Sequence, residues 1–346
     1  MDLMTQINTF FYLSLFAFGT LFGSFSSVII YRLKSGEKGI MTGRSHCGSC
    51  NAILRALDLV PVFSWLINKW KCAHCKKAVS AVYPFLELSA GLLFTMIWYF
   101  LIDFTIVLTW DSLEIIKLLF WCFIGILSII YIFYDILFLE IHEWVMATWV
   151  WITALAVWVQ TMFPEFQILP HLASGIVHSN LILGSALWLT GSMIGILYVI
   201  MIRGYDEKID SVLLIWIIAS LVWFKYFFWI NLTEIAILNW LIWALAIFTF
   251  FFLQILISKW AWLGGWDLRI ALMIGLALWT TLAFPGMMLT YLSGTVLSLG
   301  YLGYSKWKHK DKWLDAQVPF GPFLAIGFFI TMFYQSDILN LMAIYF

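Results

Sequence analysis

Long apolar stretches separated by short polar segments make up most of the chain. About ten stretches approach the roughly 20 mostly apolar residues that a helix needs to cross a bilayer. They lie near 9–31, 83–103, 115–138, 144–162, 178–202, 211–230, 235–257, 268–284, 287–304 and 318–336. Because backbone polar groups inside lipid must be satisfied within their own segment, these stretches predict helices. The pattern therefore predicts an all-α polytopic membrane protein with about 8–10 transmembrane helices.

Composition supports the same class. Of 346 residues, 63% are hydrophobic and only 11% are charged, which is outside the range of soluble globular proteins. No Lys or Arg precedes the first apolar stretch, and that stretch is too long for a signal peptide, so we expect it to remain as a helix. Neither a G-x-G-x-x-G fingerprint nor a Walker A motif occurs, so nucleotide binding has no motif support, and we expect membrane lipid but no nucleic acid as a partner.

One long polar segment, residues 32–82, interrupts the apolar pattern. It holds nine of the 19 basic residues, between Arg32 and Lys77. Cytoplasmic loops of membrane proteins are enriched in Lys and Arg, which predicts a cytoplasmic location for this segment and an external N-terminus. The later loops agree, since 164–177 has no Lys or Arg whereas 305–317 has four lysines. The protein is thus expected to be a multi-pass protein of the cytoplasmic (inner) membrane.

Four of the five cysteines lie in this polar segment, as the pairs Cys47/Cys50 and Cys72/Cys75. Two Cys-x-x-Cys pairs about twenty residues apart suit a tetrahedral zinc site, because each turn presents two thiolates to one ion. A reducing cytoplasm argues against structural disulfides but leaves redox work as an alternative. We favour structural Zn²⁺ in a small cytoplasmic module. The fifth cysteine, Cys122, lies inside an apolar stretch and is expected to be a small buried hydrophobic residue.

Two aspartates near the ends of predicted helices are candidates for chemistry. Asp135 and Asp267 both fall at the predicted cytoplasmic face, and ionisable groups near membrane helices are costly and rare. Two carboxylates held close together cannot both ionise easily, so one serves as general acid and the other as general base. The alternative is an interfacial charge paired with a basic neighbour, such as Arg269 for Asp267.

A third candidate is weaker. Residues 142–146 (HEWVM) resemble a zinc-protease HExxH motif, but Met146 stands where the second histidine should be. Because one ligand is missing, polar residues at a helix start are the preferred interpretation.

Several motifs, in order along the chain, resemble the type IV prepilin leader peptidases, which are membrane aspartic proteases of the GxGD class. Residues 23–33 (GSFSSVIIYRL) resemble the opening GSFLNVVIYRL of that family, and 45–75 resemble its double Cys-x-x-Cys block. Residues 58–66 (DLVPVFSWL) resemble DLIPVLSWL, 83–88 (YPFLEL) resemble YPLVEL, and 318–325 (VPFGPFLA) resemble its closing motif.

The resemblance assigns the two aspartates. Asp135 stands where the family has its first catalytic aspartate, and Asp267 stands where it has the aspartate of GxGD, within 264–269 (GGWDLR). Two residues depart from the pattern: Trp266 replaces the glycine before Asp267, and His142 replaces a proline. The resemblance also indicates two added helices, around 203–258. It divides the chain into a first transmembrane helix at 1–31, the zinc module at 32–82, and a peptidase domain at 83–346.

This resemblance implies an endopeptidase that cleaves the leaders of type IV prepilins and pseudopilins at the cytoplasmic face of the membrane. It also implies N-methylation of the new N-terminus with S-adenosylmethionine as methyl donor, for which no binding residues are assigned. A non-catalytic membrane scaffold of pilus assembly is the alternative, with Trp266 as its best argument. A transporter is less favoured, because the notable carboxylates lie at the membrane edge and not near its centre.

Overall fold

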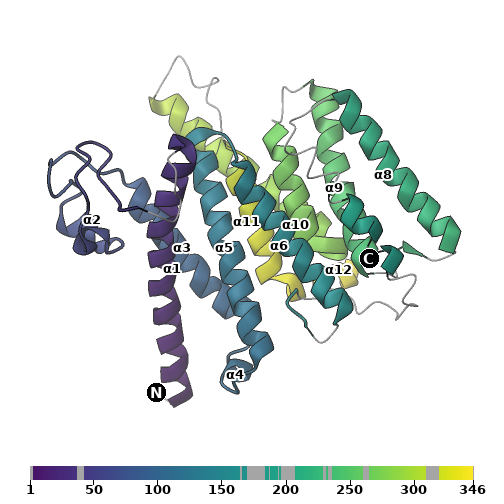
Figure 1. Ribbon diagram of the computed structural model, residues 1–346, viewed down its shortest axis with the longest axis horizontal. Helices are drawn as coiled ribbons and strands as arrows, with labels where there is room; N and C mark the ends of the chain where they lie inside the picture. The colour runs from purple at the N-terminus through teal and green to yellow at the C-terminus, as the bar shows by residue number, and fades with distance from the viewer. Residues whose placement is uncertain are drawn as a thin grey trace. The chain divides into compact units, whose positions relative to one another are not determined.

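The computed structural model describes residues 3–36, 43–163, 166–169, 184–186, 188–193, 195, 207–228, 231–232, 236–259, 265–308 and 319–345. Over these residues the regular secondary structure is helical, with two isolated β-bridges, so the predicted all-α class is confirmed. Five of the described helices are long and apolar enough to cross a membrane, or six if one bent pair forms a single span. The chain divides into two compact units, Met1–His142 and Glu143–Phe346 (Figure 1).

In the first unit, three long helices pack together. They are α1 (Leu3–Ser35), α3 (Val82–Leu101) and α5 (Ser112–Phe138). The polar segment between α1 and α3 forms a small module that contains the short helices η1 (Ala56–Leu59) and α2 (Phe63–Ile67). Figure 1 shows this module at the end of α1 opposite the N-terminus.

Glycines allow α1 and α3 to approach closely. Gly19 and Gly23 are four residues apart and so share one face of α1. A Cβ atom built at Gly19 would lie 2.7 Å from the carbonyl oxygen of Ala90, and one at Gly23 would lie 2.8 Å from the Cα of Glu87. Small residues at this spacing are the common device for close contact between membrane helices, and here they set the separation of the two helices that carry the module.

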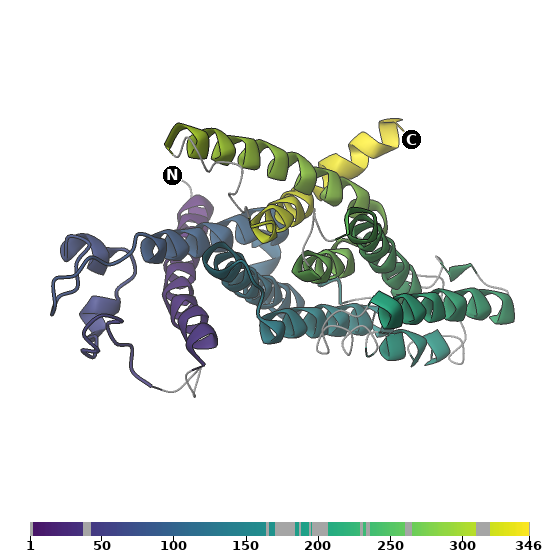
Figure 2. The ribbon, with the colours of Figure 1, turned by 90° about the horizontal axis from the view of Figure 1, so that it is seen from above.

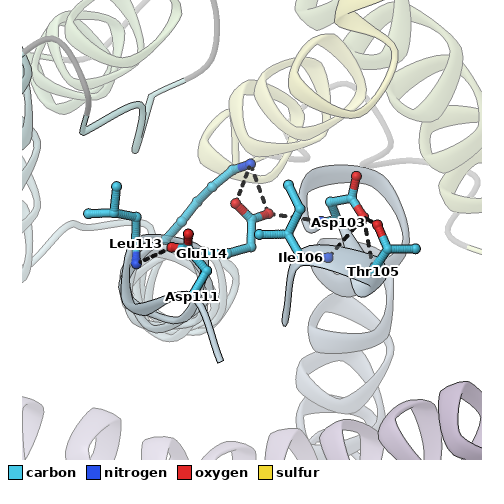
Figure 3. Close-up of polar contacts among 7 residues, drawn as sticks. Asp103, Thr105, Ile106, Asp111, Leu113 and Glu114 are labelled. Carbon is cyan, nitrogen blue, oxygen red and sulfur yellow. Dashed lines mark hydrogen bonds and ion pairs between the residues drawn. The ribbon is translucent and has the colours of Figure 1, made fainter. Parts of the chain in front are cut away.

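At the other end of the unit, polar contacts fix the turn between α3 and α5 (Figure 3). Asp103 caps the short helix α4 (Phe104–Val107), and Asp111 caps α5. Glu114 accepts hydrogen bonds from the ammonium group of Lys117, at 3.1 Å, and from the backbone N–H of Asp103, at 2.8 Å. These contacts satisfy backbone donors that the two helix starts would otherwise leave without partners.

The described residues of the second unit form six helices, and α10 contacts four of the others: α6, α9, α11 and α12. Their bounds are α6 (Glu143–Met162), α8 (Glu207–Phe228), α9 (Ala236–Ser258), α10 (Gly265–Lys308), α11 (Gly321–Phe333) and α12 (Gln335–Tyr345). Figure 2 shows the later part of α10 as the long light-green helix beside the yellow α11.

Two predicted helix boundaries differ from the structure in this unit. The segments predicted at 268–284 and 287–304 form one helix, α10, with Pro285 inside it where the two were expected to meet. The later part of this helix, Leu282–Gly300, is by itself a candidate membrane span. A Cβ atom built at Gly286 would meet the side chain of Leu278, eight residues earlier, so the helix is bent near the proline. The segment predicted at 318–336 is instead broken at Tyr334, where α11 and α12 meet at a bend of 78°. Most of the helix predicted at 178–202 lies outside the described residues.

Candidate metal centre and catalytic aspartates

Each Cys-x-x-Cys pair lies in the same kind of turn. In the first turn, the Cys47 N–H donates to the carbonyl of Ala52 at 3.0 Å, and the Asn51 N–H donates to the carbonyl of Cys47 at 2.8 Å. The isolated bridge between His46 and Ile53 closes this turn. Asn51 has a φ of 55°, a left-handed conformation that asparagine tolerates better than most residues.

The second turn repeats this geometry. The Cys72 N–H donates to the carbonyl of Lys77 at 2.8 Å, and the Lys76 N–H donates to the carbonyl of Cys72 at 3.1 Å. Lys76, which corresponds to Asn51, also has a positive φ, of 60°. Two equivalent turns therefore present two thiols each.

The structure brings the four predicted cysteines together. Their Sγ atoms all lie within 4.8 Å of one another, and those of Cys47 and Cys75 are 4.0 Å apart. All four are free thiols, so no disulfide competes for them. A tetrahedral zinc ion with Zn–S bonds of about 2.3 Å requires sulfur atoms about 3.8 Å apart, so a small contraction would close the site. The donor set fits the structural zinc that the spacing predicts.

Backbone amides lower the pKa of one of the four thiols. The Ser49 and Cys50 amides hydrogen-bond to Cys47 and lower the pKa of its thiol to about 6, the Ser49 bond being 3.4 Å long. The Ala52 amide lowers the pKa of Cys50, but desolvation and hydrogen bonding to Cys47 and Cys75 outweigh it and raise that pKa to about 11. The backbone amides around Cys47 therefore favour its thiolate, the form that binds metal.

A buried carboxylate joins the module to α3. Glu87 is only 8% exposed, and its Oε2 accepts a 2.7 Å hydrogen bond from the backbone N–H of Val62. The Ser24 side chain on α1 also interacts with this carboxylate. Sequence reasoning missed Glu87, although a glutamate inside an otherwise apolar stretch is a usable signal.

A cavity of about 400 Å³ lies next to these contacts, between the two turns of the module, α1 and the start of α3. Sequence reasoning missed this cavity too. Hydroxyl residues at Ser24 and Ser27, on the apolar helix α1, mark the side that faces it.

Asp135 lies in the last turn of α5 and is buried, with 7% of its surface exposed. The helix ends at Phe138, and the next residue, Leu139, caps it with a left-handed φ of 54° and an N–H that donates to the carbonyl of Asp135 at 2.8 Å. Beyond it, Glu140 forms a 2.8 Å ion pair with Lys34 at the end of α1. The predicted catalytic carboxylate therefore lies at a capped helix end, inside the first unit.

Asp267 lies in the first turn of α10, in the second unit. Its side chain and that of its neighbour Trp266 are outside the described part of the chain, so the pairing of Asp135 with Asp267 stays a prediction. Of the closing motif, Val318 also lies outside the described residues, whereas Pro322 occupies the first turn of α11, the position expected for proline.

Residues 17–101, which include the later part of α1, the metal turns and α3, match the family model described as the bacterial peptidase A24 N-terminal domain. The chain is 38% identical over 80 residues to the prepilin leader peptidase/N-methyltransferase of Myxococcus xanthus, an alignment that covers 23% of this chain and 24% of the relative. Proteins of the same name from Aeromonas salmonicida and Dickeya chrysanthemi are 33% and 34% identical, over 22% and 28% of this chain and 35% and 43% of their own lengths.

The matched part thus spans less than half of each of these relatives. No solved structure matches the chain. The similarity to prepilin leader peptidases thus covers the N-terminal part of the chain, where the motifs at 23–33, 45–75, 58–66 and 83–88 resemble that family.

Proposed function

We propose that this protein is a membrane aspartic endopeptidase that cleaves the leader peptides of type IV prepilins and pseudopilins and N-methylates the new N-terminus. The observation that carries the proposal is the match of residues 17–101 to the A24 N-terminal domain, together with relatives named prepilin leader peptidase/N-methyltransferase. The GxGD-like segment at Asp267 and the motif around Asp135 extend the proposal to the rest of the chain.

In the proposed mechanism, Asp135 and Asp267 act as a pair. One carboxylate accepts a proton from water while the oxygen of that water attacks the scissile carbonyl carbon. The other carboxylate, protonated at the start, gives its proton to the leaving amine nitrogen as the peptide bond breaks. A prepilin joins a charged leader to a hydrophobic helix, so its scissile bond belongs at the cytoplasmic headgroup boundary, where the positive-inside rule puts both aspartates.

The other proposed groups have separate tasks. Zinc, held by Cys47, Cys50, Cys72 and Cys75, would stabilise the fold of the module and take no part in cleavage. S-adenosylmethionine, when bound, would supply an electrophilic methyl group for the new N-terminal amine. The inner membrane is the proposed location, with both activities on the cytoplasmic side.

Coexpression with a candidate prepilin, followed by mass spectrometry of the pilin N-terminus, tests both activities at once. We expect Asp135→Asn and Asp267→Asn each to lower cleavage at least about 100-fold, the usual contribution of an acid–base group. Asp337→Asn, at an exposed position on α12, is the matched control and should cleave normally. Full cleavage in either of the first two variants would exclude the pair.

A non-catalytic scaffold is the second candidate, and Trp266 in place of the family glycine is the observation that favours it. In that case the wild-type protein would co-purify with prepilin but leave the leader and the N-terminus unchanged. The same mass measurement therefore separates the two functions.

A further inference from the structure

The short helix α2 of the polar module turns its apolar side outward. Ser64, Trp65 and Asn68, in and directly after α2, line the cavity and so face the inside of the first unit. Phe63 and Ile67 are four residues apart, on one face of the helix, and have 65% and 77% of their surface exposed. A helix of a soluble protein buries such a face. Exposed apolar residues that gather in this way mark an interaction surface.

Two further residues extend the apolar surface. Leu66, three residues after Phe63, completes the outer face of α2, which we define as Phe63, Leu66 and Ile67. Trp70 follows the helix and is 53% exposed, although its ring also packs on Trp65, with centroids 5.3 Å apart. Tryptophan is enriched where the interior of a membrane meets water. An exposed tryptophan beside an apolar helix face is therefore typical of contact with a bilayer surface.

The second cysteine turn adds positive charge to this surface. Four exposed lysines lie in the turn or directly before it: Lys69, Lys71, Lys76 and Lys77. The bridge between Lys71 and Ala78 brings the two ends of this stretch together. Residues 43–81 include six Lys or Arg but only one acidic residue. Four thiolates around one Zn²⁺ would add two negative charges, which still leaves the module positive.

The position of the module indicates lipid as the partner. Figure 1 and Figure 2 both show the module to the side of α1 and the start of α3, and in Figure 1 it lies beside the last turns of α1 and not beyond them. Helix α1 is a candidate membrane span, and its exposed Phe18, Phe22 and Phe25 would meet acyl chains. The lipid around α1 therefore extends directly to the module. The cytoplasmic leaflet, on the side predicted for the module, is anionic and matches the lysines.

We propose that the outer face of α2, together with Trp70 and the four lysines, is a lipid-binding surface that lies in the headgroup region of the cytoplasmic leaflet and prefers anionic phospholipids. The outer face contacts the upper part of the acyl chains, as the apolar side of an interfacial helix does. Trp70 lies at the boundary with water, and the lysines bind lipid phosphates. The proposal does not depend on the proposed function, because it involves neither aspartate and no reaction.

Photo-crosslinking identifies the partner of the outer face directly. The full-length protein, with p-benzoylphenylalanine in place of Ile67, is reconstituted in vesicles of equal parts phosphatidylcholine and phosphatidylglycerol, illuminated, and analysed by mass spectrometry. We expect phospholipid adducts, with phosphatidylglycerol captured at least about twofold more than phosphatidylcholine. The same amino acid in place of Ser64, which lines the cavity on the other side of α2, is the matched control and should capture no lipid. At Ile67, an adduct to a second protein chain, or no adduct, would overturn the proposal.

A second variant tests the charges. Lys69→Gln combined with Lys71→Gln, with the probe at Ile67, should lower the excess of phosphatidylglycerol by at least about half, because two of the four lysines are neutralised. Lys225→Gln, at an exposed position on α8 outside the module, should leave that excess unchanged. Resistance of residues 43–81 to protease in detergent, equal to that of the wild type, shows that the double variant is folded. Equal capture of the two lipids by the protein with all its lysines, or an unchanged excess in the double variant, would refute the anionic preference.

Discussion

The Glu87 carboxylate on α3 accepts a 2.7 Å hydrogen bond from the backbone N–H of Val62, the residue immediately before α2. Val62 has a φ of 60°, which is unusual for a β-branched residue. A side chain from a membrane-spanning helix therefore holds a strained point of the polar module. This contact ties the position of the metal turns to the packing of α1 and α3.

We expect Glu87→Ala to loosen the module, because it leaves the Val62 N–H without its acceptor at a cost of about 1–3 kcal/mol. Glu87→Gln keeps an acceptor oxygen in place and should be milder. Limited proteolysis of the folded protein, scored for cuts within residues 43–81, measures the difference. A Glu87→Ala protein as resistant as the wild type would show that the bond does not hold the module.

We expect Gly19→Val to disrupt the contact between α1 and α3. Its Cβ would lie 2.7 Å from the Ala90 carbonyl oxygen, which belongs to the backbone and cannot rotate away. Overpacking of this kind costs about 1–3 kcal/mol. Ala17→Val, at an exposed position on α1, is the control. Thermal unfolding in detergent should show a lower midpoint for Gly19→Val alone, and equal midpoints for the two variants would contradict close packing as its reason.

Sequence patterns predicted local features well and spatial contacts poorly. The Cys-x-x-Cys spacing predicted the four-thiol cluster, because the turn itself determines where the sulfur atoms point. The apolar stretch at 115–138 predicted α5 to within a few residues. Around Pro285 the pattern predicted two helices, whereas the structure has one helix, α10, which is bent near the proline and does not end there. It also missed the hydrogen bond between Glu87 and Val62. These residues are 25 positions apart in the sequence, and no periodic pattern indicates a contact between them.

We expect the stability of the module to fall at low pH, because the Asp58 carboxylate becomes protonated. The hydrogen bond from the Arg55 side chain lowers the pKa of the Asp58 carboxyl below its ordinary value. Because the pKa of Asp58 is lower in the folded state, its carboxylate stabilises the fold fully above the ordinary pKa of about 3.9. This stabilisation is lost as the pH falls through the pKa that Asp58 has in the folded state.

The Arg55–Asp58 ion pair, 3.2 Å long, has a largely exposed arginine, so the effect should be at most about 1 kcal/mol. Protease resistance of the module measured from pH 5 to pH 3 should fall less steeply in Asp58→Asn than in the wild type. Arg55→Gln should flatten the curve in the same way, and unchanged curves in both variants would refute the role of the pair.

Metal content should follow the four-thiol cluster. We expect one equivalent of zinc per chain in the wild type and in Cys122→Ala, whose cysteine is buried in α5 away from the cluster. Cys47→Ser combined with Cys50→Ser removes two of the four ligands, so this protein should lose the metal and its module should become sensitive to protease.

Zinc affinity should also rise with pH, because Cys50 has a pKa of about 11 without metal and must release its proton to bind. Metal analysis of the purified proteins, together with competition by a chelator at pH 6 and pH 8, measures both effects. A wild-type protein with four free thiols, no metal and a resistant module would show that the two turns fold without zinc. Their repeated backbone hydrogen bonds would then be sufficient to hold the cysteines together.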